Sequence, residues 1–173
     1  MVSIRGASRP AAPAPERPVM VWTRDPTCSV GPGMSYRFID HTGDVAVDLQ
    51  APDVPTLFGE AASALTDTLV DRSTIASAAT CDVRLEAPDL EVLLVDWLSD
   101  LLFRFESEGW LTRDARVQLA ESRDGWSLEA TAYGEAFDPD RHTARVLVKA
   151  VTYHGLAVLR TSSGVSARVV FDI

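Results

Sequence analysis

The chain has 173 residues, of which 46% are hydrophobic and 24% are charged, and its formal net charge at pH 7 is −9. This length and composition suit a single globular domain with a sizeable core. No stretch reaches the roughly 20 apolar residues that a membrane-spanning helix needs. Residues 1–34 hold four arginines against Glu16 and Asp25, so the remainder carries −11. Such an acidic domain disfavours direct nucleic-acid binding and favours cations and basic protein surfaces as partners.

The first 34 residues are rich in Pro, Ala, Arg and Ser and show neither helical nor strand periodicity. This composition predicts a disordered extension over 1–34 and a folded domain over 35–173. The extension has no apolar run of the secretory type. Cys28 falls in this extension and Cys81 on the apolar side of a strand pattern, so no disulfide is expected between them. We therefore expect a cytoplasmic protein.

The first half of the folded domain mixes strands with two helices. Residues 36–39 and 45–49 have strand patterns, and Asp53 with Pro55 opens a helix that extends to about residue 70. A further strand alternates over 81–86. The strongest helix pattern runs from about 89 to 106, and apolar residues on its far side predict that a sheet and a second helix or partner cover it.

The last third of the chain has the pattern of strands alone. Strands are expected around 117–119, 126–130, 145–151, 156–160 and 166–172, with turns at Asp124-Gly125, Gly155 and Ser163-Gly164. The element order lacks the regular β-α-β alternation of a doubly wound fold. The predicted class is therefore α+β, a single domain with mixed or antiparallel sheets and two main helices.

A short acidic segment, Asp40-His41-Thr42-Gly43-Asp44, lies between the first two predicted strands of the domain. Aspartate oxygens at such a turn are suitable ligands for hard cations such as Ca²⁺ or Mg²⁺. The alternative is a structural turn in which the aspartates accept hydrogen bonds from backbone amides. The local pattern alone leaves both interpretations open.

The chain ends inside a predicted strand, at Asp172-Ile173. Because most termini fray, a terminus that ends on a β-branched residue in a strand is expected to be held in place. It would then keep the Asp172 side chain and the Ile173 α-carboxylate close together, as two further hard oxygen donors. The alternative is an ordinary last strand with a solvated carboxylate.

Lys149 is the only lysine, since all fifteen other basic residues are arginines. It lies within an apolar stretch, residues 146–151, that has a strand pattern. A compact ammonium in this context indicates a charge facing a carboxylate or a phosphate, or a lysine of lowered pKa. The alternative is the exposed face of an edge strand.

The other polar candidates have weaker patterns. No histidine or cysteine pair has zinc-ligand spacing, and the motifs of hydrolytic nucleophiles and phosphate-binding loops do not occur. Asp96, on the apolar helix, is either an ion-pair partner of an arginine or a group at an interface. His154 flanks a predicted turn and, like Asp96, is expected to be an interface or structural residue.

Several of these segments together resemble the archease family over residues 35–173. The resemblance rests on the segments 38–44, 94–98, Gly134-Glu135 with Asp138 and His142, 148–156 and 171–173. The run Lys-Ala-Val-Thr-Tyr-His-Gly at 149–155 and the final Asp-Ile are the most specific of them.

The resemblance implies a cofactor protein rather than an enzyme. Archeases activate a GTP-dependent RNA ligase of tRNA splicing and RNA repair, which joins 2′,3′-cyclic-phosphate or 3′-phosphate ends to 5′-hydroxyl ends. They promote guanylylation of the ligase and its turnover. They also bind a divalent cation, which is expected to be Ca²⁺, with Mg²⁺ and Mn²⁺ as alternatives.

The same resemblance implies which residues matter. The metal ligands would be Asp44, Asp172 and Ile173, and ligase activation would depend on Lys149, Asp44 and His41. The chain departs from the family pattern at Gly43, where alanine is usual, which could loosen the turn.

Two other functions remain as alternatives. A small metal-dependent hydrolase would use the same carboxylates, with His41 as its base. A chaperone-like scaffold would act through the helix at 89–106.

Overall fold

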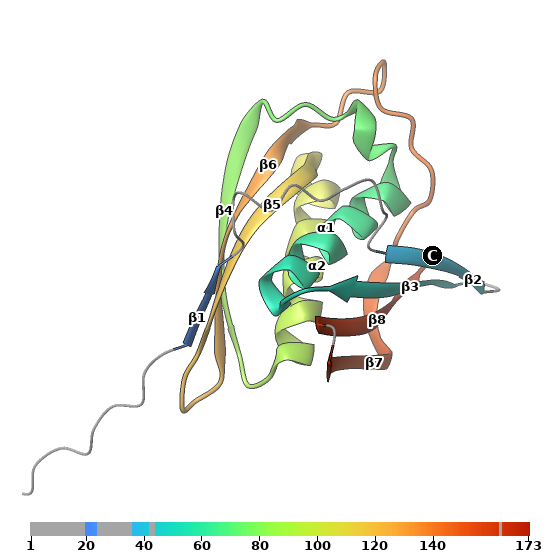
Figure 1. Cartoon of the computed structure of the whole chain (residues 1–173). Helices are drawn as coiled ribbons and strands as arrows, with labels where there is room; N and C mark the ends of the chain where they lie inside the picture. The colour runs from blue at the N-terminus through green and yellow to red at the C-terminus, as the bar shows by residue number, and fades with distance from the viewer. Residues whose placement is uncertain (1–19, 24–35, 42–43, 163) are drawn as a thin grey trace, which may run out of the picture.

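The computed structural model describes residues 20–23, 36–41, 44–162 and 164–173. In this part of the chain two antiparallel four-stranded sheets enclose two α-helices, α1 and α2 (Figure 1). The strand order is β1-β5-β6-β4 in one sheet and β2-β3-β8-β7 in the other. The strands are β1 (Met20–Thr23), β2 (Tyr36–His41), β3 (Asp44–Ala51), β4 (Ala79–Ala87), β5 (Trp110–Glu121), β6 (Trp126–Ala136), β7 (Ala150–Thr161) and β8 (Gly164–Asp172). The predicted α+β class is confirmed, and all strand pairs are antiparallel.

Both helices start where the sequence predicts. The Asp53 carboxylate caps α1 (Val54–Leu69) by accepting a 2.8 Å hydrogen bond from the Thr56 N–H, and Asp89 does the same for α2 (Leu90–Glu108) through the Val92 N–H. These bonds satisfy donors that the first helical turn leaves without a partner. Gly109, with φ of 69°, ends α2 in the left-handed conformation that favours glycine.

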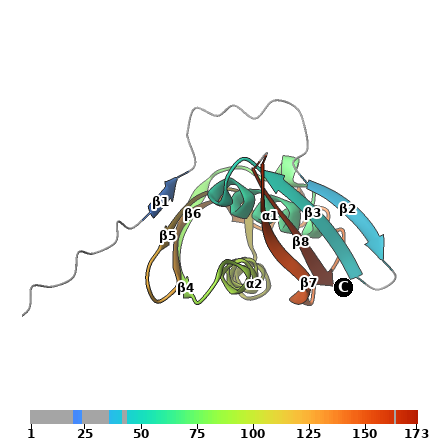
Figure 2. The ribbon, with the colours of Figure 1, turned by 60° about the horizontal axis from the view of Figure 1, so that its bottom comes forward.

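The helices form the middle layer of the molecule, between the two sheets (Figure 2). Helix α2 contacts β7 on one side, strands of the other sheet on the other side, and α1. The predicted cover on two sides is therefore confirmed. Trp97 is fully buried in this layer, and its Nε1–H donates a 3.1 Å hydrogen bond to the Phe58 carbonyl of α1. Phe103, on the same helix, is 62% exposed.

Strand β7 differs from its prediction. It is one strand, Ala150–Thr161, where the pattern indicates two strands separated by a turn at Gly155. The cause is an irregularity in its pairing with β8, because Thr152 opposes Val170 whereas Ala157 opposes Arg168. The extra residues of β7 bulge out of the ladder, and Gly155 adopts a φ of 65° there.

Residues 145–149 also differ from their prediction, since they precede β7 rather than form part of a strand. This segment passes from one sheet to the other beside the end of α1. Ala144 forms an isolated bridge with Val70, and the Arg145 N–H donates a 2.8 Å hydrogen bond to the Leu69 carbonyl. The backbone groups at the start of this segment are therefore hydrogen-bonded to the end of α1 instead of to a neighbouring strand.

Four residues of the predicted disordered extension are placed in a strand. Met20–Thr23 form β1, which pairs with Gln118–Glu121 at the edge of the first sheet. Valine, tryptophan and threonine favour this conformation, and the surrounding prolines obscure so short a pattern. The remainder of 1–34, including Cys28, lies outside the described residues. No described helix combines the length and the hydropathy needed to cross a membrane.

Two substitutions on α2 test the packing of the middle layer. Trp97→Ala removes a fully buried ring and a hydrogen bond, so we expect the free energy of unfolding to fall by about 3–5 kcal/mol. Phe103→Ala removes a ring that is largely exposed, and we expect a loss of about 0.5 kcal/mol or less. Urea unfolding followed by circular dichroism measures both. Equal losses in the two variants would show that α2 is not packed as described.

Candidate functional site

One cross-strand row at the end of the second sheet brings together the acidic segments from the two ends of the domain. His41 opposes Asp44, Asp44 opposes Asp172, and Asp172 opposes Ala150, so the row crosses all four strands β2, β3, β8 and β7. Lys149 and Ile173 are the chain neighbours of Ala150 and Asp172. Residues more than 120 positions apart in the sequence thus become neighbours through strand register alone.

The aspartates of this row project from the outer face of the sheet. In β3 the alternate residues Val47 and Leu49 are buried in the core, and in β8 so are Val169 and Phe171. Asp44 and Asp172 occupy the opposite phase of each strand, so both side chains lie on the face away from the helices. Both are half-buried. Directly opposed side chains have Cβ atoms about 4.5–5.5 Å apart, so two carboxylates here repel each other unless a cation lies nearby.

Lys149 is bonded twice to the last residues of the chain. Its backbone N–H donates a 2.8 Å hydrogen bond to the Asp172 carbonyl, and its Nζ donates another of 2.8 Å to the main-chain oxygen of Ile173. The residue itself is exposed. The ammonium therefore sits at the end of β8, in line with the interpretation that it faces an oxygen of the acidic cluster.

The structure gathers four of the predicted site residues, which are Asp44, Asp172, Ile173 and Lys149. The backbone of His41 belongs to the same row, but its side chain and residues 42–43 lie outside the described part. Asp96 is on α2, and no described arginine or histidine forms an ion pair with it. His154 is exposed in the irregular part of β7, where its N–H lies 3.3 Å from the Thr152 hydroxyl.

The donor chemistry of the row fits a hard divalent cation. Its oxygens come from two aspartate side chains and the main chain of Ile173, and Ca²⁺ and Mg²⁺ prefer such ligands. Among the described residues, no group of three or more His, Cys, Asp or Glu side chains is arranged to hold a metal ion. A site in this row would thus need the main-chain oxygen as well as both aspartates. Metal binding remains a prediction.

A second charged row lies on the same face, four residues further along β3 and β8. Asp48 accepts two hydrogen bonds from Arg168, at 2.6 and 2.9 Å, and Arg37 approaches it to 3.6 Å. The hydrogen bonds from Arg168 are the main cause that lowers the pKa of Asp48. Asp48 is thus a carboxylate already neutralised by arginines, in contrast to the opposed pair Asp44 and Asp172.

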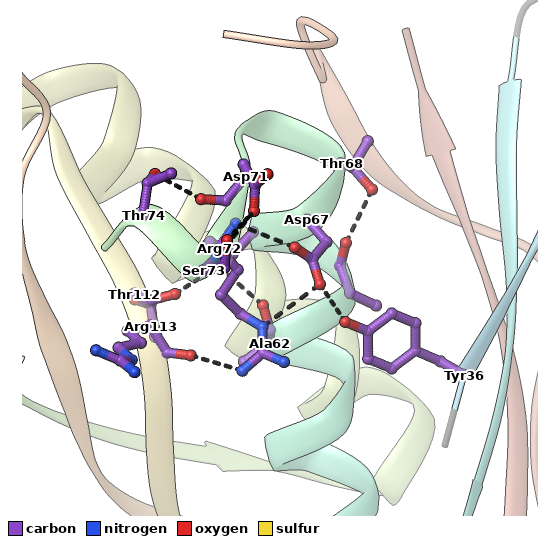
Figure 3. Close-up of polar contacts among 12 residues, drawn as sticks. Tyr36, Ala62, Asp67, Thr68, Asp71, Arg72, Ser73, Thr74, Thr112 and Arg113 are labelled. Carbon is purple, nitrogen blue, oxygen red and sulfur yellow. Dashed lines mark hydrogen bonds and ion pairs between the residues drawn. The ribbon is translucent and has the colours of Figure 1, made fainter. Parts of the chain in front are cut away.

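A polar cluster fixes the start of β2, the strand that leads to the row. The Tyr36 hydroxyl donates a hydrogen bond to the Asp67 carboxylate of α1, and the Arg72 backbone N–H donates to the same carboxylate at 3.1 Å (Figure 3). Arg72 also bonds the Arg113 carbonyl of β5 at 3.1 Å. Burial, followed by the bond to Asp67, raises the pKa of the Tyr36 phenol. The cluster therefore ties β2 to the helical layer.

A second cluster fixes the connection between β6 and Lys149, and sequence reasoning missed it. Glu135 accepts two hydrogen bonds from the Arg141 guanidinium, at 2.6 and 3.2 Å, and one of 2.6 Å from the Ala76 N–H. The bonds from Arg141, then that from Ala76, lower the pKa of Glu135 to about 2. Arg141 and Glu135 thus close the loop that starts at the end of β6.

His142 is the buried residue of this loop, with 1% of its surface exposed. Its Nδ1 accepts a 2.9 Å hydrogen bond from the Asp138 N–H, so Nδ1 carries no proton. Its Nε2 lies 3.3 Å from Glu135 Oε1 without the geometry of a hydrogen bond. In the sequence, the only signal for His142 was its place with Glu135 and Asp138 among the segments that resemble the archease family.

Comparisons with known proteins agree on one family. The model of the archease protein family matches residues 36–173. The archease of Methanopyrus kandleri is 37% identical over 140 residues, which cover 81% of this chain and 100% of that protein. The archease of Methanosarcina barkeri is 36% identical over 142 residues, covering 82% and 97% respectively.

Two solved structures have a similar fold. The solution structure of protein 1598 from Methanobacterium thermoautotrophicum has a TM-score of 0.71 at 31% identity, and the match covers 82% of this chain and 100% of that one. An archease from Thermotoga maritima has a TM-score of 0.54, with 78% and 94% covered. At 22% identity this second likeness concerns the fold alone.

The Glu135 cluster predicts a specific pH dependence of stability. Because folding lowers the Glu135 pKa from its usual 4.5 to about 2, this carboxylate contributes stability above pH 4.5 that is lost as the pH falls toward 2. Glu135→Gln should therefore reduce the free energy of unfolding at pH 7, and its difference from wild type should shrink between pH 4.5 and 2.

Glu129→Gln is the matched control, because Glu129 lies on the same strand in an exposed pair with Arg84 and should have little effect at pH 7. Urea unfolding across the pH range measures both variants. A difference between wild type and Glu135→Gln that stays constant down to pH 2 would contradict the role given to Glu135.

Proposed function

The chain belongs to the archease family, and from this we propose that it activates a GTP-dependent RNA ligase. The ligase would join 2′,3′-cyclic-phosphate or 3′-phosphate RNA ends to 5′-hydroxyl ends, in tRNA splicing or RNA repair in the cytoplasm. The chain would promote guanylylation of the ligase and its turnover, without catalysing a reaction of its own.

The observation that carries this proposal is the pairing of Asp44 with Asp172 beside Lys149 and Ile173. Directly opposed carboxylates destabilise a sheet, so an arrangement of this kind is consistent with a binding role. We propose that Asp44, Asp172 and the α-carboxylate of Ile173 hold a divalent cation, with Ca²⁺ the best candidate. Bound there, the cation would neutralise the cluster and offer its remaining coordination positions to water or to a group of the partner.

The charge of the domain supports a protein partner over RNA. Residues 35–173 carry −11, and an acidic surface repels the phosphates that dominate nucleic-acid binding. The site also lies on an outer sheet face rather than inside the helical layer. A partner can therefore reach it without any rearrangement of the core.

The chaperone alternative has one observation in its favour. The archease of Thermotoga maritima is described as a possible chaperone, and in this chain α2 exposes 62% of Phe103. Loss of function on Val92 or Phe103 substitution, together with retained function after neutralisation of Asp44 and Asp172, would favour this alternative. The hydrolase alternative depends on His41 as its base, and turnover of phosphoesters by the protein alone would support it.

Guanylylation of the ligase tests the proposal directly. We expect wild-type protein to raise the amount of ligase–GMP adduct formed from labelled GTP, and Asp44→Ala and Lys149→Ala each to lower this stimulation by about tenfold or more. Asp48→Ala is the control, because Asp48 lies on the same face and strand but is paired with Arg168. Circular dichroism confirms folding of each variant. No stimulation by the wild-type protein would rule out the proposed function, and equal stimulation by all four proteins would rule out the role of Asp44 and Lys149.

The role of the Ile173 carboxylate predicts an asymmetry between tags. A peptide tag fused after Ile173 converts its α-carboxylate into an amide and places chain beside Lys149. It should therefore reduce ligase stimulation much more than the same tag fused before Met1. The two fusions are compared at equal concentration in the guanylylation assay, and cleavage of the tag back to Ile173 should restore activity. Equal activity of both fusions would argue against a terminal ligand.

A further inference from the structure

The Lys149 ammonium holds an oxygen of the same Ile173 carboxylate that the proposed cation would need. Its Nζ lies 2.8 Å from the main-chain oxygen of Ile173. An ammonium group only donates hydrogen bonds and carries a full positive charge, and Ca²⁺ takes its oxygen ligands at about 2.3–2.6 Å. Both groups on one carboxylate would place two positive charges within a few ångströms of each other, where they repel.

We propose that Lys149 is an internal counter-ion that competes with the divalent cation for the Ile173 carboxylate. When the cation binds, the Lys149 ammonium leaves this carboxylate and becomes available to an anionic group of the partner. This inference rests on the proposed function and adds a form of regulation to the same site. Whether a cation is bound therefore determines whether the Lys149 ammonium is bonded to Ile173 or available to the partner.

The surroundings of Lys149 allow such an exchange without a change of fold. Its backbone is fixed by the bond from its N–H to the Asp172 carbonyl and by the preceding Val148, which is fully buried. The side chain itself is exposed, and an exposed ion pair costs little to break. Only the flexible four-carbon stem has to move.

The distribution of charge on the outer sheet face favours this role for Lys149. Among the described residues of this face, Arg168 and Arg37 are both engaged with Asp48. On the described part of the face, Lys149 is thus the positive group that bonds the end of the row of Asp44 and Asp172. In the absence of a bound cation it supplies the charge that partly offsets the two carboxylates.

Calorimetric titration with CaCl₂ tests the competition at physiological ionic strength. Lys149→Met keeps most of the stem but removes the charge, and it should bind Ca²⁺ roughly five- to tenfold more tightly than wild type. Lys149→Arg retains the charge and should stay close to wild type. Arg168→Met is the control for loss of a charge on the same face. Arg168 lies about 13 Å from Asp172 along β8, beyond the screening length of about 8 Å. Its replacement should therefore change the dissociation constant for Ca²⁺ by less than about twofold.

The single lysine offers a second readout that is independent of ligase activity. Protein labelled with lysine that carries ¹³C only at Cε gives one lysine side-chain signal, that of Lys149. We expect its Cε resonance to shift on addition of Ca²⁺, with the dissociation constant that calorimetry gives for wild type. Asp172→Asn should weaken both the heat and the shift.

The outcomes separate this inference from the function on which it rests. If wild type binds Ca²⁺, but Lys149→Met binds no more tightly and the lysine signal does not move, the competition is wrong while the cation site stands. If wild type and Asp172→Asn bind Ca²⁺ equally, or neither binds it, the proposed site itself fails. If Arg168→Met gained as much Ca²⁺ affinity as Lys149→Met, the gain would come from the change in net charge alone. That result would also overturn the competition.

Discussion

The register between β3 and β8 is the constraint on which the site depends. It places Asp44 opposite Asp172, two residues from the two ends of the domain. If either strand slipped by one residue, its aspartate would move to the core face, where an unpaired carboxylate is very costly. The register is held by the inner residues of the same strands, including Val47, Val169 and Phe171, which are buried against the helices. The core thus fixes the position of the acidic pair while taking no part in its chemistry.

Two polar clusters fix the positions of the segments next to β3 and β8. Tyr36 and Asp67 tie β2 to α1, and Glu135 with Arg141 closes the loop that leads toward Lys149. Both clusters lie outside the row itself. The site therefore combines a rigid sheet, which carries the carboxylates, with a lysine whose backbone is fixed and whose exposed side chain bonds the last residue. This division suits a protein that presents charge to a partner and needs no enclosed pocket.

The local elements could be predicted because local residues determine them. Asp53 and Asp89 cap helices whose apolar stripes are evident in the sequence, and Gly125 allows the hairpin between β5 and β6. The continuity of β7 could not be predicted, because Gly155 has the same signal at a bulge as at a turn. The burial of His142 was missed for a related reason, since it depends on packing by distant elements. The pairing of Asp44 with Asp172 is also non-local, and before the structure only the family resemblance linked them.

We propose that Asp44, Asp172 and Ile173 hold one divalent cation on the outer face of the sheet. Anomalous diffraction from crystals grown with Mn²⁺, which substitutes for Ca²⁺ at many oxygen sites, locates such an ion without reference to activity. We predict one strong anomalous peak in contact with both aspartates and the Ile173 carboxylate, which disappears in crystals of Asp172→Asn. A peak elsewhere on the molecule, or none at saturating Mn²⁺ in a protein that still stimulates the ligase, would contradict the account.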